Sequence, residues 1–269
     1  MNKMDFLSLL HTDLDELREL QPVDWADIIA PTLRNINSSF CMVYKAVIDG
    51  KMVGTGAVIY HGHTAWLATI IVHPDHRNKG YGKRITQYLI DSIDRVRYPT
   101  ILLDATHFGY LVYKSLGFET ITHHVHFDIT SPYPVVASSP HMRPFEQNDL
   151  KQILALDRVA TGEDRTATLL TKVSTAIVFA DGGRVGGFYM PDLMKGLLIA
   201  DNPVAGIELM KIRLQHQPNC MLPEENNAAL DFFIDAGYTQ SRTSTRMRLG
   251  PAVEWQPEFI YNVASGAIG

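Results

Sequence analysis

One stretch of the chain, residues 65–91, constrains the fold more than any other. Leu67 to Val72 is a short, apolar, β-branched run that predicts a buried strand, and His73-Pro74 ends it because proline cannot donate to a strand ladder. Residues 77–82, RNKGYG, form a basic glycine turn, and residues 83–93 carry apolar side chains at helical spacing. A strand, a glycine turn and a helix start direct several backbone N–H groups at one place, where the helix dipole favours an anion. The stretch therefore predicts a site for phosphate or pyrophosphate.

The sequence pattern of the turn limits which phosphate ligands are expected. It lacks the GxxxxGK[ST] pattern of nucleoside-triphosphate loops and the GxGxxG pattern of dinucleotide sites. The chain instead reads V-x-P-x-x-R-x-x-G-x-G, with Val72, Pro74, Arg77, Gly80 and Gly82 at the fixed positions. This pattern, after a strand and before an amphipathic helix, resembles the acyl-CoA signature of the GNAT N-acetyltransferase family. A plain structural turn between strand and helix is the alternative interpretation.

A second pattern supports the same resemblance. Residues 113–118 read Y-x-x-x-G-F, which is similar to a second GNAT motif, and Gly117 suits the left-handed end of a helix. The family often has asparagine seven residues before that tyrosine, and this chain departs from it with Thr106. The resemblance is strongest from Val53 to Phe118.

The order of predicted elements indicates a duplicated fold. The first half is expected to run β-αα-β-β-β-α-β-α-β, the order that the GNAT resemblance implies. Residues 131–141, SPYPVVASSPH, are typical of a linker, and the second half then repeats the first in outline. We therefore expect an α/β (α+β) protein with two tandem GNAT-like domains, each a mixed, mostly antiparallel twisted sheet flanked by helices. The expected boundaries are 1–130 for the acetyltransferase domain, 131–142 for the linker and 143–269 for the second domain.

The second copy is degenerate where chemistry is expected. After the predicted strand Leu197 to Ala200, residues 201–206 hold no arginine and only one glycine, and Asp201 would repel phosphate. Phe233 stands where the first copy has Tyr113. We expect one acyl-CoA site per chain, in the first half, with the second domain serving as a wall of the acceptor site.

The second half also contains a polar cluster and an apolar C-terminal stretch. The polar cluster of Asp157, Gly162, Asp164 and Arg165 either binds the amine and carboxylate of a substrate or forms a helix cap with a surface ion pair. The apolar residues in 256–269 predict a short amphipathic helix.

Composition excludes several classes of function. The 269 residues are 46% hydrophobic and 20% charged, with a net charge of −5, so we expect no binding to nucleic acid or to an anionic membrane. Cys41 and Cys220 are too few and too isolated for a disulfide framework, and we expect a reducing, cytoplasmic setting. The start of the chain is not typical of a signal peptide, and no apolar run approaches the ~18 residues of a membrane span. Three histidine clusters lack a carboxylate at ligand spacing, so no metal site is expected.

The GNAT resemblance assigns roles to individual residues. The backbone of Ile71 and Val72 is expected to pair with the pantetheine arm, and the amides of residues 78–83 to hold the pyrophosphate. Tyr113 is expected to protonate the departing thiolate, because a tyrosine keeps its proton at neutral pH. The full coenzyme set is Ile71, Val72, Arg77, Asn78, Lys79, Gly80, Tyr81, Gly82, Lys83 and Thr106.

The general base is less determined. Asp104, His63 and His107 are each candidates to deprotonate the amine, directly or through water, and Asp104 is our first choice because it ends a predicted strand beside the site. Neither cysteine lies near a motif, so direct transfer in a ternary complex is expected.

The sequence thus predicts an acetyltransferase that moves an acetyl group from acetyl-CoA to a primary amine of a small molecule. A non-catalytic acyl-CoA or small-ligand sensor and a protein-lysine acetyltransferase are the alternatives. The chain is expected to be a monomer or a homodimer.

Overall fold

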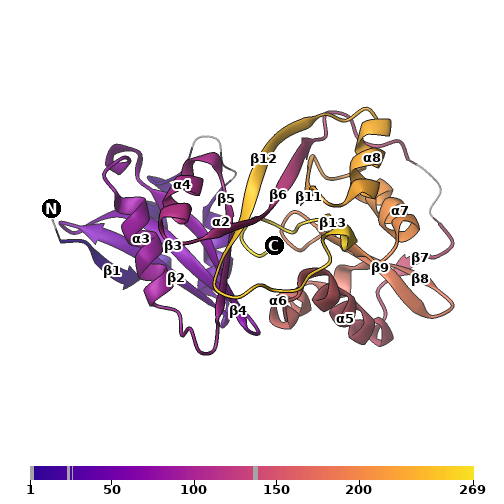
Figure 1. Cartoon of the computed structure of the whole chain (residues 1–269), viewed down its shortest axis with the longest axis horizontal. Helices are drawn as coiled ribbons and strands as arrows, with labels where there is room; N and C mark the ends of the chain where they lie inside the picture. Colours follow the sequence, from indigo (N-terminus) through magenta and orange to yellow (C-terminus); the bar gives the residue numbers. More distant parts are fainter. Residues whose placement is uncertain (1–2, 23–24, 26, 136–138) are drawn as a thin grey trace. The chain divides into compact units, whose positions relative to one another are not determined.

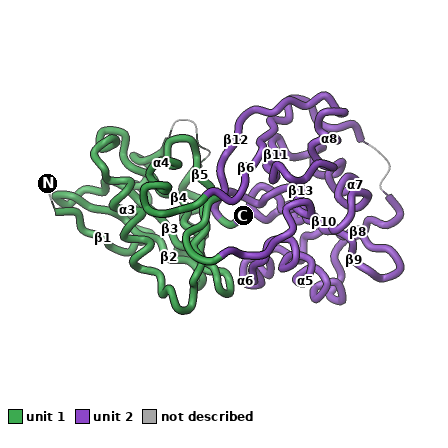
Figure 2. Tube along the Cα trace, viewed as in Figure 1, with its two compact units in different colours: residues 1–119, 247–251, 268 green, residues 120–246, 252–267, 269 purple. Residues whose placement is uncertain are grey.

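The computed structural model describes residues 3–22, 25, 27–135 and 139–269, so positions 136–138 of the expected linker lie outside the described residues. The chain forms two compact units (Figure 2). The first comprises Met1–Glu119, Met247–Pro251 and Ile268. The second comprises Thr120–Arg246, Ala252–Ala267 and Gly269.

The first half of the chain has the expected order of strands and helices (Figure 1). Apart from short 3-10 turns, its elements are β1 Asp5–Ser8, α1 Leu14–Arg18, α2 Ile29–Ile36, β2 Cys41–Ile48, β3 Lys51–His61, β4 Thr64–Val72, α3 Tyr81–Asp91, β5 Thr100–Ala105, α4 His107–Ser115 and β6 Glu119–Asp128. The predicted α/β fold with mostly antiparallel sheets is confirmed: β1 to β4 pair antiparallel, and β4 and β5 pair in parallel.

The second half repeats this order. Its elements are β7 Met142–Pro144, α5 Leu150–Thr161, α6 Thr166–Leu170, β8 Ile177–Asp181, β9 Arg184–Met190, β10 Leu197–Ala200, α7 Pro203–Arg213, β11 Asn219–Pro223, α8 Asn227–Asp235 and β12 Gln240–Leu249. Helix α7 thus corresponds to α3, and β10 and β11 correspond to β4 and β5. The internal duplication is visible in the fold.

The last strand of each half is not grouped with its own half. All of strand β6 except Glu119 belongs to the second unit. There it pairs antiparallel with β11, from Asn219↔Asp128 to Pro223↔His124. The end of β12, from Met247, counts with the first unit and joins its core. The strand order around these elements is β5-β12-β6-β11. Each unit is therefore completed by a strand from the other half of the sequence.

The tail of the chain differs from its prediction. The expected amphipathic helix in 256–269 is wrong: a 3-10 turn at Pro257–Phe259 leads into strand β13, Ile260–Asn262. Strand β13 pairs antiparallel with β10. The Val263 N–H donates to the carbonyl of Met221 on β11 at 2.8 Å. Pairing with distant strands overrides the helical spacing of the apolar residues.

Close packing of α3 on the sheet depends on two glycines of β3. A Cβ on Gly54 would lie 2.6 Å from Ile85 Cδ1 and 2.7 Å from the carbonyl oxygen of Ile71. A Cβ on Gly56 would lie 2.7 Å from Leu89 Cδ1. These positions let α3 lie directly on the strands (Figure 1), which fixes where the start of α3 meets the end of β4.

Gly54→Val should therefore destabilise the first unit. The added methyl groups have no space between Ile85 and the backbone of β4, and overpacking of this kind costs about 1–3 kcal/mol. Urea unfolding of the variant and of Lys51→Ala, an exposed position on the same strand, gives the comparison. Equal unfolding free energies for the two variants would contradict the packing described here.

Candidate functional site

Strands β4 and β5 start as neighbours and then separate. Their parallel pairing ends after three positions, Thr64↔Thr100, Ala65↔Ile101 and Trp66↔Leu102. Both strands continue past this point, β4 to Val72 and β5 to Ala105. Backbone groups on the β5 side of β4 are therefore free of that ladder and can pair with an extended ligand.

A bulge in β4 accompanies the separation. On the opposite side of β4, Ala57 pairs with Ala68 and Thr55 pairs with Ile71, so one residue of β3 faces two of β4. Thr69, inside the bulge, has a φ of 52°. A left-handed conformation is unfavourable for a β-branched residue, and bulges bend a strand and increase its twist. The bulge thus turns the end of β4 away from β5.

The end of β4 leads directly into the glycine turn. His73 Nδ1 accepts a hydrogen bond from the Asp75 N–H at 3.2 Å, and Arg77 Nε donates to the Val72 carbonyl at 3.2 Å. Asn78 and Gly80 have left-handed φ values of 59° and 78°, and residues 77–80 are all exposed. The sequence prediction of a strand, a turn and a helix start is confirmed in its geometry, and it is local hydrogen bonding that shapes the turn.

The start of α3 is open to a ligand. Gly80 is the N-cap residue and has no side chain to accept from the first helical amides, which have no acceptor within the helix. A Cβ on Gly80 would meet nothing within 4 Å, and one on Gly82 would meet only Val72 Cγ2, at 3.7 Å. Packing within the protein therefore does not require glycine at position 82. A small side chain would fit there unless something else must approach the backbone.

Asp104 lies close enough to Tyr113 to act on its charge. Asp104 lies near the end of β5 and Tyr113 on the last turns of α4, which contacts α3. Burial and the Asp104 carboxylate raise the pKa of Tyr113 to about 12. The phenol therefore stays protonated across the neutral range and can act as a proton donor.

Gly109 is a site residue that sequence reasoning missed. A Cβ at this position of α4 would lie 2.6 Å from Cε2 and 3.2 Å from the hydroxyl oxygen of Tyr113, so the tyrosine ring lies across Gly109. A glycine four residues before the motif tyrosine, on the same helix face, is the signal that could have identified it.

Gly109→Ala should separate stability from activity. Alanine favours a helix interior over glycine by up to about 1 kcal/mol, so the helix itself gains. The new methyl group must push the ring of Tyr113 aside, and we expect turnover to fall about tenfold. Steady-state kinetics with thermal unfolding on the same samples test this, and unchanged turnover would show that the position of the ring does not matter.

Residues 8–118 match the model of the acetyltransferase (GNAT) family. The match covers most of the first unit and less than half of the chain. No curated protein sequence matches the chain.

Solved structures resemble the chain over both units. A presumed acetyltransferase from Pyrococcus horikoshii aligns with a TM-score of 0.83 at 21% identity, over 99% of this chain and 96% of that one. A GCN5-related N-acetyltransferase from Sphaerobacter thermophilus gives 0.64 at 14% identity, over 94% and 98% of the two chains. A tandem GNAT protein from the clavulanic acid biosynthesis pathway gives 0.57 at 12% identity, over 93% and 100%. At these identities the likeness establishes the fold, and a tandem GNAT architecture fits this chain.

Other predicted site residues of the first unit lie either after the end of β5 or before the start of β4. Thr106 is the N-cap residue of α4, directly after β5, and His107 is exposed in the first turn of that helix. His63 precedes the first residue of β4, whereas Ile71 is near its last residue. At about 3.3 Å per residue the two ends of β4 are more than ~20 Å apart. The structure therefore groups Asp104, rather than His63, with Tyr113.

The start of α7 in the second unit contrasts with the start of α3. The Asn202 side chain accepts a hydrogen bond from the Ala205 N–H at 2.9 Å, and Pro203 occupies the first helical turn. Asp201 forms an ion pair with Arg184. A side-chain oxygen and a carboxylate thus stand where the first unit has an exposed glycine turn.

The tail fills the space beside β10. Strand β13 pairs with β10, and Asn262 Oδ1 accepts from the Met221 N–H on β11 at 2.9 Å. The Tyr261 ring lies against Gly206 of α7, where a Cβ would be 2.1 Å from Cζ. In the first unit the corresponding strands separate, whereas here the protein's own backbone lies between them.

The polar cluster of the second unit follows the structural alternative. Arg165 is fully buried and binds Asp157 through two hydrogen bonds, of 2.5 and 3.1 Å. Asp164 pairs with Arg158 at 2.7 Å and accepts from the Thr166 hydroxyl at 2.6 Å. The cluster is an internal ion pair with a helix cap, so the expectation that Arg165 could bind a substrate carboxylate is not supported by its position.

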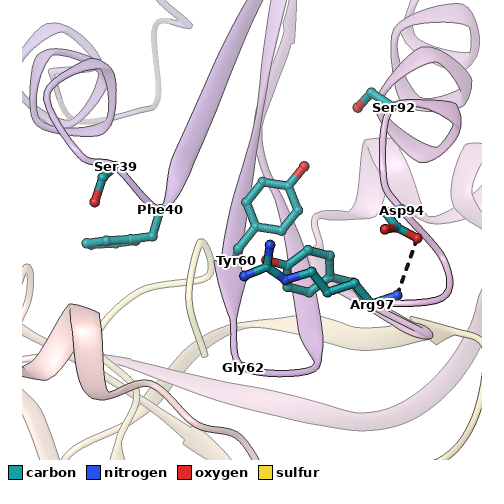
Figure 3. Close-up of a pocket in the computed structure, with 8 residues that line it drawn as sticks. Ser39, Phe40, Tyr60, Gly62, Ser92, Asp94 and Arg97 are labelled. Carbon is teal, nitrogen blue, oxygen red and sulfur yellow. Dashed lines mark hydrogen bonds between the residues drawn. The ribbon is translucent and has the colours of Figure 1, made fainter.

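A pocket of about 490 Å³ lies in the first unit, near the start of β4 (Figure 3). It is lined by Ser39, Phe40, Tyr60, Gly62, Ser92, Asp94, Arg97 and Tyr98. The Tyr60 and Tyr98 rings lie 4.5 Å apart, and the Arg97 guanidinium lies 5.1 Å from the centre of the Tyr98 ring. These residues precede the start of β4 or follow the end of α3, so the pocket is separate from the glycine turn.

Three further observations concern the part of the chain that the structure describes. It contains no cluster of three or more histidine, cysteine or acidic residues that could hold a metal ion. None of its helices is long and apolar enough to cross a membrane. Cys41 and Cys220 are free thiols, and burial raises the pKa of each to about 11.

Proposed function

We propose that this chain transfers an acetyl group from acetyl-CoA to a primary amine of a small molecule, by direct transfer in a ternary complex. The observation that carries the proposal is the separation of β4 from β5 after Trp66, followed by an uncapped helix start with two glycines. Neither Gly80 nor Gly82 is needed to avoid a clash inside the protein. The left-handed φ of 78° accounts for glycine at position 80, whereas a ligand that must approach the backbone closely explains the missing side chain at position 82.

The free edge of β4 and the glycine turn suit different parts of acetyl-CoA. The free edge of β4 at Ile71 and Val72 offers backbone donors and acceptors to the amide groups of the pantetheine arm. The exposed amides of residues 78–83 and the side chain of Lys83 suit the pyrophosphate. Arg77 stabilises the turn itself through its bond to the Val72 carbonyl.

Acyl transfer from a thioester to an amine needs a neutral amine, a donor for the oxyanion and a proton for the departing thiolate. Tyr113 is the proposed proton donor, since its raised pKa keeps it protonated where a thiolate of pKa near ~8.5 leaves. Asp104, which raises that pKa, is the proposed base, acting directly or through water. Backbone amides of β4 at the separation point are the proposed donors to the acyl oxygen.

Direct transfer is favoured over an acyl-enzyme. An acyl-enzyme needs a thiolate or another activated nucleophile, and the pKa values of Cys41 and Cys220, each raised to about 11, keep these thiols protonated at neutral pH. The contrast between α3 and α7, together with β13 beside β10, supports one acetyl-CoA site per chain. A cytoplasmic setting, a role of the second domain in acceptor binding, and a monomeric or homodimeric state stay predictions.

Thiol release from acetyl-CoA in the presence of a panel of small amines tests the proposal. Turnover that depends on a small amine would support it. Tight binding of acetyl-CoA without turnover over the whole panel would favour the sensor instead. Turnover only with lysine-containing peptides would replace the small-molecule acceptor by a protein.

A further inference from the structure

The second unit contains three fully or almost fully buried arginines, and they differ in their partners. Arg165 is paired with buried Asp157 at 2.5 Å, and Arg246 with buried Glu163 at 3.7 Å. Arg213, the last residue of α7, is 0% exposed and has no carboxylate partner among the described residues. A buried charge of this kind normally has a counter-charge.

Arg213 also lacks hydrogen-bond acceptors. Its Nη2 donates to the Lys195 carbonyl at 3.0 Å, while Nε and Nη1 are buried with no acceptor in the described part of the chain. The Nε2 atom of Gln215, two residues further, is a second buried donor in the same situation. Arginine can only donate, so the surroundings of the Arg213 guanidinium are poor in acceptors.

Arg213 and Arg242 both act on the charge of Lys195, while Asp192 acts with Arg213 on neighbouring Tyr189. Lys195, in the loop between β9 and β10, reaches the surface, yet partial burial and the charges of Arg242 and Arg213 lower the pKa of its ammonium group. Asp128 is the acidic group that acts in the opposite direction on Lys195. The local field therefore favours a negative charge.

A purely structural role explains only part of this arrangement. A cation at the C-terminal end of α7 is favoured by the helix dipole, and the bond to the Lys195 carbonyl holds the loop before β10. Neither interaction uses Nε or Nη1. Arg165 and Arg246 show that the same unit supplies buried carboxylates where it needs to neutralise a guanidinium.

We propose that the end of α7 and the loop between β9 and β10 bind a small oxyanion, of the phosphate or carboxylate type. Arg213 supplies the buried charge and the donors Nε and Nη1, and Lys195 supplies the charge on the solvent side, where the anion enters. This site is independent of the acetyl-CoA site proposed for the first unit.

Thermal unfolding with increasing inorganic phosphate, at constant ionic strength with chloride, tests the proposal. The full chain is used with Gly82→Glu, so that phosphate at the glycine turn of the first unit does not contribute. We expect a saturable rise in Tm, and Lys195→Met should raise the midpoint phosphate concentration at least tenfold. Lys211→Met, which removes a lysine paired with Glu208 on the same helix, is the matched control and should leave the midpoint unchanged.

Acetate and sulfate, tested in the same way, distinguish the sources of the anion. A response to phosphate and sulfate alone indicates a tetrahedral oxyanion, and a response to acetate indicates a carboxylate. The proposal is overturned if none of the three anions gives a saturable rise, or if Lys195→Met and Lys211→Met behave alike.

The Tm of Arg213→Met, measured without and with phosphate, is a second test of the proposal. Without phosphate, removing an unpaired buried charge should leave Tm unchanged or raise it, and the response to phosphate should disappear. Arg165→Met should lower Tm strongly, because it leaves Asp157 buried and unpaired. A fall in Tm for Arg213→Met as large as that for Arg165→Met would show that the protein itself neutralises Arg213 and would overturn the proposal.

Discussion

Replacing Tyr113 with phenylalanine is expected to lower kcat by about ten- to hundredfold, while KM for acetyl-CoA changes by less than about twofold. The phenyl ring keeps the packing of Tyr113 against Phe118, whose ring centre is 6.0 Å away, so the structure should be preserved. The hydroxyl that protonates the thiolate is lost, and the thiolate must leave unprotonated or take a proton from water.

The pH dependence of the same reaction gives a second check on Tyr113. Burial and the Asp104 carboxylate raise the pKa of Tyr113 to about 12, above its ordinary value of 10.0. Since the protonated form is the acid, kcat should not fall between pH 8 and about pH 10 because of this residue. Initial rates over this range measure the effect. Unchanged kcat in Tyr113→Phe, or a fall near pH 9 that this variant removes, would contradict the assigned role.

Gly82→Glu is the second change with a large expected effect, and it should act on binding and stability in opposite directions. An acidic residue in the first turn of α3 is favourable to the helix dipole, and the Cβ has space. The same carboxylate would stand in the place of the pyrophosphate and repel it. We expect KM for acetyl-CoA to rise about a hundredfold, equivalent to ~2.7 kcal/mol, with Tm unchanged or higher.

Gln87→Glu is the matched control for this change. It adds the same charge at an exposed position of α3, one and a half turns further along the helix. KM for acetyl-CoA should stay within about threefold of the original value. A similar loss of affinity in both variants would mean that net charge, rather than the turn at the start of α3, determines coenzyme binding.

Local signals account for the parts of the structure that the sequence predicted. The order of strands and helices follows from short-range periodicity, and the glycine turn follows from proline and glycine at fixed spacing. The start of α3 was expected near Lys83, and the helix begins at Tyr81. Strand β10 was expected at Leu197 to Ala200 and is found there.

Long-range pairing accounts for what the sequence did not predict. Strands β6 and β12 have the alternating pattern of strands, but nothing in that pattern says which neighbour each one joins. Strand β13 has apolar residues that also fit a helix, and only β10 and β11 fix its extended form. The bulge at Thr69 places a β-branched residue at positive φ, against its local preference.

The candidate site shows the same division. The motif positions Arg77, Gly80 and Gly82 could be assigned because the pattern resembles the GNAT acyl-CoA signature. The ring position of Tyr113 over Gly109 depends on how α4 packs, and setting His63 aside depends on which end of β4 separates from β5. Both required three-dimensional information.

Calorimetric titration of the full chain with acetyl-CoA tests the central claim most directly. The account predicts one molecule bound per chain, with binding lost in Gly82→Glu and kept when Asn202, which caps α7 in the second unit, is changed to alanine. Two molecules bound per chain, or binding that survives Gly82→Glu and is lost in Asn202→Ala, would contradict it.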